Sequence, residues 1–170
     1  MDKQCATLLL AFLLFSCKSS PTNSTQEGFL AFYIVQDTTL SAYDVKQSVG
    51  SVSLVPTPLF TVKNITTYHW STHTFEGTAS FDSLMQRLRY IPGKTSGLPF
   101  VIVVGSDRVY VGAFWYPYSS QRPTVPYIDV YLSAPYQISR SPADSVDVRN
   151  DERVRQALDR VTRPQYRCQC

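Results

Sequence analysis

Two histidines and a glutamate lie close together in the chain and are the first side chains to consider for chemistry. The segment YHWSTHTFE contains His69 and His73, the two histidines of the sequence, with Glu76 shortly after them. Imidazole and carboxylate groups bind zinc and act as general acids and bases. These residues define one functional alternative, a small periplasmic or surface hydrolase or a metal-dependent enzyme that uses His69 and His73.

The spacing of the histidines bears on this alternative. Residues four apart bring both imidazoles to one metal ion only on a helix, and TTYHWSTHT has no helix start or stop signal. On a strand, the two side chains share a face but lie about 13 Å apart. We therefore interpret His69 and His73 as partly exposed or hydrogen-bonded side chains. We expect no metal and no cofactor, and a binding or assembly role in place of catalysis.

An aromatic cluster is the second candidate site. The segment FWYPYSS, residues 114–120, contains Trp115, Tyr116 and Tyr118. Exposed Trp and Tyr side chains stack on sugars and anchor peptides. Alternation along an extended chain places Trp115 and Tyr116 on opposite faces. We expect a ligand to bind around these three aromatic residues, unless helices cover both faces and make them part of the core.

The strands and helices predicted around these side chains indicate an α+β fold. Strands are predicted at 28–36, 51–56, 59–62, 98–115 (two strands around a turn at 105–108) and 126–132, whereas 63–70 is open between turn and strand. Helices are predicted at 41–48, 80–91 and 151–161. We expect a mainly antiparallel sheet with two or three helices packed on one face.

Each predicted helix begins at a residue that can cap free backbone N–H groups. Ser41 with Asp44 three residues later suggests a cap for the first helix, Ser80 for the second and Asn150 for the third. The second helix has an apolar face made by Phe81, Leu84, Met85, Leu88 and Ile91.

The N-terminus has the pattern of a targeting segment. Its apolar run, residues 6–15, is about ten residues long, as in a signal peptide, whereas a membrane-spanning helix needs about 20. LFSC, residues 14–17, resembles the lipobox of bacterial lipoproteins, with Phe15 where small residues are commoner. The resemblance implies cleavage before Cys17 and acylation of its thiol. Lys18 in place of Asp favours the outer membrane where the host has two.

These features predict the organisation of the chain. We expect a signal peptide at 1–16, a lipidated Cys and tether at 17–27, one α+β domain at 28–163 and a tail at 164–170. The segment 98–120 is similar to stretches of uncharacterised bacterial envelope proteins, a resemblance that implies no activity.

A secretory signal of a eukaryotic or viral protein is the alternative to the lipobox. Asn23 and Asn64 would then be glycosylation acceptors, because each begins an Asn-x-Ser/Thr tripeptide.

The net charge bears on the kind of partner, and the cysteine positions bear on disulfide bonds. The net charge of +3 comes without a Lys/Arg run, so we expect no nucleic-acid binding. The cysteines are Cys5, Cys17, Cys168 and Cys170, so the predicted domain has no disulfide framework. We expect a protein of the cell envelope that is held to a membrane by its lipid and that has an envelope glycan or protein as partner.

The lipobox generates the first prediction. We expect Cys17→Ser to move the protein out of the detergent-extracted membrane fraction, because acyl chains that bury about 0.8 kcal/mol per CH₂ group would be lost. Cell fractionation and mass spectrometry of the N-terminal peptide measure this. Membrane retention of the variant together with a wild-type peptide that carries no acyl mass would contradict the lipoprotein interpretation.

Overall fold

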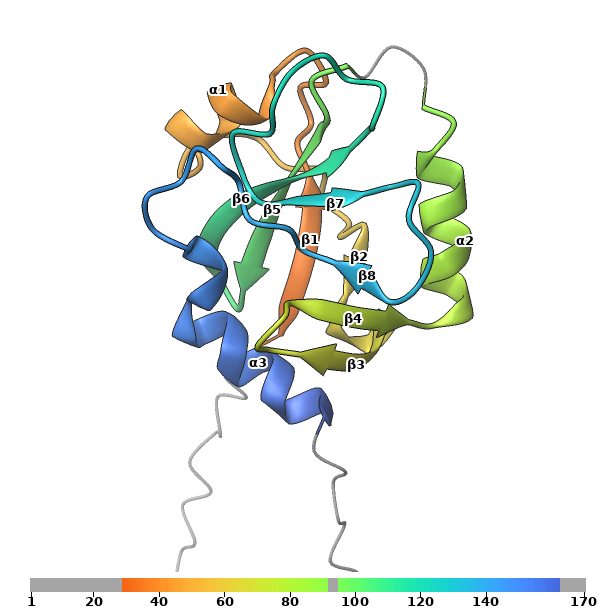
Figure 1. The fold of residues 1–170 in the computed structure, drawn as a ribbon. Coiled ribbons are helices and arrows are strands. Elements are labelled where there is room, and N and C mark those ends of the chain that lie inside the picture. The colour runs from red at the N-terminus through yellow and green to blue at the C-terminus, as the bar shows by residue number, and fades with distance from the viewer. Residues whose placement is uncertain (1–28, 92–94, 163–170) are drawn as a thin grey trace, which may run out of the picture.

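The computed structural model describes residues 29–91 and 95–162, which form an α+β fold with two sheets (Figure 1). The predicted signal peptide, Cys17, the predicted tether and the predicted C-terminal tail lie outside the described residues. The larger sheet has the order β2 (Phe60–Thr61), β1 (Leu30–Ile34), β5 (Leu98–Val104), β6 (Asp107–Trp115), β7 (Tyr127–Asp129). The smaller sheet has the order β3 (Ile65–His69), β4 (Thr74–Gly77), β8 (Tyr136–Gln137).

The helices are close to their predicted positions. They are α1 (Ala42–Gln47), α2 (Ala79–Leu88) and α3 (Glu152–Thr162), with 3₁₀ turns η1 (Val62–Asn64) and η2 (Val148–Asn150). The predicted α+β class is confirmed. No helix within the described ranges combines the length and apolar character that crossing a bilayer requires.

Strand pairing is antiparallel except at one position. The predicted hairpin is the pair β5–β6, whose turn is shorter than expected and begins at Gly105, with a φ of 63° that suits glycine. β7 pairs in parallel with β6, Ala113 lying opposite Tyr127. The strand expected at 51–56 forms only a single bridge, between Leu54 and Val35. The sequence after Leu54 contains two prolines, which donate no backbone hydrogen bond and limit a ladder there.

One of the three predicted helix caps is observed, and in the other two helices a different residue occupies the N-cap position. Ser41 and Asp44 form a reciprocal capping box, and these hydrogen bonds lower the pKa of Asp44. α2 begins one residue before Ser80, with Thr78 at the N-cap position and no side-chain capping bond. In α3 the cap is Asp151 in place of Asn150, since its Oδ1 accepts a 2.9 Å hydrogen bond from the backbone N–H of the second residue after it.

Both faces of the larger sheet are buried. On one face, side chains such as Phe100 and Phe114 pack with α2, α3 and residues of the smaller sheet. On the other, Val101 and Val111 pack with α1 and the segment after it. Two helices thus share one face as expected, and α1 covers the opposite one. Successive side chains along β5 and β6 therefore point into opposite halves of the core.

An aromatic stack fills the larger half of the core and depends on Gly112. The rings of Phe32 and Phe60 stack 3.9 Å apart, and Phe100 lies 4.9 Å from Phe114. Phe100 also lies over Gly112, where an added Cβ would come within 2.4 Å of its ring and 3.1 Å of a backbone oxygen. Glycine is required here because the ring occupies the space that a side chain would need.

This close approach predicts the effect of adding a single methyl group. We expect Gly112→Ala to lower the free energy of unfolding by about 1–3 kcal/mol, because the buried Phe100 ring has to move. Urea denaturation measures the change. Gly50→Ala is the matched control, since no atom lies within 4 Å of the added Cβ, and we expect it to leave stability unchanged or slightly raised. Equal effects at the two glycines would contradict this account.

Candidate functional site

The aromatic platform predicted from the sequence is not formed. Trp115 is 8% exposed and Tyr116 is fully buried, so only Tyr118, at 54%, reaches solvent. Trp115 packs in the half of the core beneath α1, whereas Tyr116 lies on the other side and donates a 2.9 Å hydrogen bond to the carbonyl of Leu88. Burial raises the pKa of Tyr116 to about 12. The expectation of a ligand surface here is corrected because helices cover both faces.

The two histidines occupy different environments. His69 is exposed at the end of β3, whereas His73 is 4% exposed and adopts a positive φ of 51° in the turn before β4. The Tyr68 hydroxyl lies 2.8 Å from Nδ1 of His73, and the Trp70 ring packs edge-on against the imidazole. Within residues 29–91 and 95–162 no group of three His, Cys, Asp or Glu side chains is placed to hold a metal ion.

His73 belongs to a partly buried polar cluster that joins the smaller sheet to η2. Asp147 accepts two hydrogen bonds from the Arg149 guanidinium, at 2.8 and 2.6 Å, and Arg149 also donates to the carbonyl of Ile138 at 2.7 Å. Burial, and then the charge of Arg149, lower the pKa of His73. The hydrogen bonds from Arg149 likewise lower the pKa of Asp147. Each group has a partner, so we assign this cluster a structural role.

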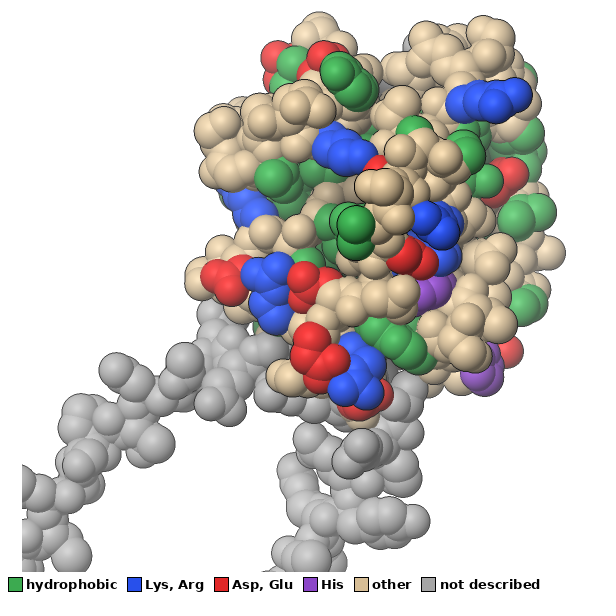
Figure 2. All heavy atoms as spheres, turned by 60° about the vertical axis from the view of Figure 1, so that its left-hand side comes forward, with side chains coloured by type: hydrophobic (Ala, Val, Ile, Leu, Met, Phe, Trp, Pro, Cys, Tyr) green, Lys and Arg blue, Asp and Glu red, His purple; other side chains and the backbone are tan. Residues whose placement is uncertain are grey.

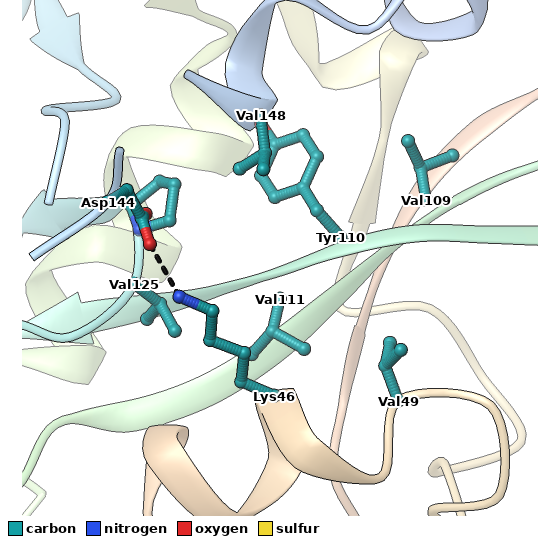
Figure 3. A pocket seen from close by; sticks show the side chains of 9 residues that line it. Lys46, Val49, Val109, Tyr110, Val111, Val125, Asp144 and Val148 are labelled. Carbon is teal, nitrogen blue, oxygen red and sulfur yellow. Dashed lines mark hydrogen bonds and ion pairs between the residues drawn. The ribbon is translucent and has the colours of Figure 1, made fainter. Parts of the chain in front are cut away.

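A cavity of about 180 Å³ lies beside α1, β6 and the segment leading to η2 (Figure 3). Its walls are mostly aliphatic. The residues that line it are Lys46, Val49, Val109, Tyr110, Val111, Val125, Pro126, Asp144 and Val148. Burial raises the pKa of Tyr110 well above its ordinary value, so this phenol is neutral at physiological pH.

An ion pair provides the charged groups of the cavity wall. Nζ of Lys46 lies 2.5 Å from Oδ1 of Asp144 and 3.3 Å from the carbonyl oxygen of Thr124. The Asp144 side chain is 7% exposed and that of Lys46 is 40% exposed. Within the described residues, Oδ2 of Asp144 is the buried side-chain oxygen or nitrogen that lacks a hydrogen-bond partner. This oxygen is enclosed by surrounding protein atoms and is not open to the cavity.

The backbone on both sides of the cavity is held by hydrogen bonds. Ser141, which is fully buried, donates from Oγ to the carbonyl of Pro123 at 3.0 Å, and Arg140 donates to the carbonyl of Asp144 at 2.7 Å. On the other side, Arg108 donates to the carbonyls of Val49 and Val52, at 2.8 and 2.6 Å. These bonds position both ends of the ion pair.

Sequence reasoning did not find this site. Lys46 lies in the last turn of a predicted helix, and Asp144 lies between predicted elements, separated from Lys46 by 98 residues. No local motif connects them. Only the packing of α1 and the 141–148 segment against the sheet brings the two charges together.

Comparisons of the chain with protein-family models, curated proteins and solved structures found no match. The assignment of a function therefore depends on the site itself.

The environment of His73 predicts a pH-dependent stability. Its folded pKa lies below the ordinary value of 6.5, so the unfolded chain takes up the proton first as the pH falls. Stability is therefore complete above about pH 6.5 and decreases below it. We expect His73→Asn, which tolerates the positive φ, to show a smaller loss of unfolding free energy between pH 7.5 and 5.5 than the wild type.

The exposed histidine is the matched control for this prediction. His69→Asn removes an imidazole from the same hairpin and should keep the pH dependence of the wild type. Urea denaturation at both pH values measures all three proteins. The same pH dependence in His73→Asn and the wild type would rule out His73 as its source.

Proposed function

We propose that the chain is a lipid-anchored protein of the cell envelope whose domain binds a small molecule in the cavity beside Asp144. The observation that carries the binding function is the cavity itself, a space of about 180 Å³ whose wall is mostly aliphatic and includes the Lys46–Asp144 ion pair. A ligand that fills this space would bury apolar surface against the aliphatic side chains.

The size of the cavity supports a ligand smaller than a typical drug. Its volume of about 180 Å³ is similar to that of an engineered apolar cavity of about 150 Å³ that binds benzene. Pockets for drug-sized molecules have about 300–1,000 Å³. A single aromatic ring or a short aliphatic chain therefore fits.

The surface around the site supports a small, uncharged or weakly charged partner. On the face shown in Figure 2, acidic and basic side chains are interspersed and apolar ones lie among them. Ion pairs such as Arg153–Asp151 and Arg155–Glu152 account for part of this pattern on α3. A surface of mixed charge does not attract a polyanion in the way that a basic patch does.

The positions of the chain ends are compatible with an anchor. β1 begins and α3 ends at the same end of the molecule, far from α1 and the loops at the opposite end (Figure 1). A tether from Cys17 to β1 would leave that opposite end free in the surrounding solution. The evidence for acylation itself is the LFSC motif.

The binding function is tested with toluene as the probe. We expect saturable binding to the full-length chain, with NMR chemical-shift changes concentrated at amides of the cavity wall, such as those of Val111 and Val125. Val148→Phe should weaken binding about tenfold or more, equivalent to about 1.4 kcal/mol, because the added ring occupies the cavity.

Val146→Phe is the matched control because Val146 is exposed and does not line the cavity. It should bind toluene as the wild type does. If toluene does not bind the wild-type cavity, the proposed binding function is wrong.

A further inference from the structure

We infer that a surface site formed by Tyr118, Tyr131 and Arg89 binds a neutral saccharide whose flat C–H face packs on the tyrosine rings. We call these three residues the tyrosine corner. None of them lines the aliphatic cavity, so the inference goes beyond the proposed binding function and does not depend on it. Tyr118 is the member of the predicted aromatic platform that reaches solvent, and it contributes to this corner without Trp115.

The two tyrosine rings of the corner are exposed and meet nearly at a right angle. Tyr118 is 54% exposed and Tyr131 is 47% exposed. Their ring centroids are 6.3 Å apart, and the ring planes are inclined by 84°. Tyr118 also packs on the buried ring of Tyr116, with centroids 5.5 Å apart, so its exposed surface lies on the side away from Tyr116. A ligand that packs on one exposed ring therefore meets the other ring at its side.

Hydrogen bonds fix the corner before a ligand arrives. Arg89 donates from Nε to the carbonyl of Val130 at 2.7 Å and from Nη2 to the carbonyl of Leu132 at 3.2 Å, which holds the backbone on both sides of Tyr131. The backbone N–H of Tyr131 donates to Oδ1 of Asp129 at 2.8 Å. A preformed surface avoids the cost of ordering a loop, and tyrosine side chains lose little conformational entropy on binding.

The charges around Tyr131 favour a neutral ligand. The guanidinium of Arg89 lies over the ring, 6.0 Å from its centroid, and the carboxylate of Asp129 lies at the backbone of the same residue. An anion or a cation would be attracted by one of these groups and repelled by the other. The phenol, guanidinium and carboxylate groups together donate and accept hydrogen bonds. A neutral saccharide matches this surface, because each sugar ring combines an apolar C–H face with hydroxyl groups that donate and accept.

The exposed area of the corner favours a sugar over a protein partner. Tyrosine and arginine are common in protein interfaces, so a protein is the alternative. A buried aromatic side chain covers about 150–250 Å², and two half-exposed rings therefore offer about that area together. A stable protein interface needs about 800 Å² on each partner. The area of the corner is sufficient for one or two sugar rings.

The position of the corner is compatible with a polymer of the envelope as ligand. It lies where the C-terminal end of α2 meets the loop after β7, which the bonds from Arg89 join (Figure 1). This end of α2 is directed away from the end of the molecule where β1 begins and α3 ends. In the proposed anchored chain, the corner would therefore be turned away from the membrane.

The experiment titrates the full-length chain with cellotetraose, a neutral glucose tetramer that is too large for the cavity of about 180 Å³. NMR follows the backbone amides. We expect saturable chemical-shift changes at Tyr118, Tyr131 and Leu132. Tyr131→Ala should raise the dissociation constant about tenfold or more, because the ring on which the sugar packs is lost. Tyr131→Phe retains the ring and should bind within a few-fold of the wild type.

Tyr43→Ala is the matched control. It removes a tyrosine of similar exposure, 57%, from α1, which packs on the opposite face of the larger sheet from α2, and should bind cellotetraose as the wild type does. Val148→Phe, which fills the cavity, should also leave this binding unchanged, so failure at one site is distinguishable from failure at the other. Tyr118→Ala removes the second ring and keeps the test decisive if Tyr131→Ala does not fold.

Two further probes test the class of ligand. The β-1,4-linked tetramer of glucuronic acid tests the charge, and a proline-rich decapeptide tests a protein partner, because such peptides dock on aromatic surfaces. Tighter binding of either probe than of cellotetraose would overturn the assignment to a neutral saccharide. The inference would also be overturned if cellotetraose did not bind, or if its binding were undiminished in a folded Tyr131→Ala or Tyr118→Ala.

Discussion

The β5–β6 hairpin buries side chains on both of its faces, and the rest of the domain is arranged to cover them. Phe100 and Phe114 need one layer of cover and Val111 and Trp115 need another. α2, α3 and the smaller sheet provide the first, and α1 provides the second. Side chains alternate between the two faces of a strand. Phe114 and Tyr116 therefore lie in one layer and Trp115 in the other. This explains why an aromatic segment with the composition of a binding surface is part of the core.

The cavity beside Asp144 follows from the same arrangement. α1 is a short helix that packs on one face of the sheet, and the segment from Ser141 to η2 lies on the other side of the cavity. Lys46 and Asp144 pair where these two segments meet.

The polar cluster around His73 has a different role. Its members are satisfied by one another, with Arg149 joining Asp147 to the backbone of Ile138. Polar networks whose members are satisfied in this way hold elements in a single arrangement. The cluster ties the β3–β4 hairpin to η2 and so to the start of α3. His73, which attracts attention in the sequence, thus supports the fold, whereas His69 is exposed at the end of β3.

The sequence by itself determined the local structure: the capping box of α1, the apolar face of α2, the β5–β6 hairpin and the α+β class. These depend on interactions between residues near one another, which periodicity and turn chemistry report. The LFSC motif likewise predicts an anchor without any fold. Tertiary structure decided which side of the sheet each helix covers, the parallel pairing of β7, the burial of Trp115 and the meeting of Lys46 with Asp144. The physical reason is that each of these depends on contacts between distant segments, and a side chain carries no local mark of whether another element will cover it.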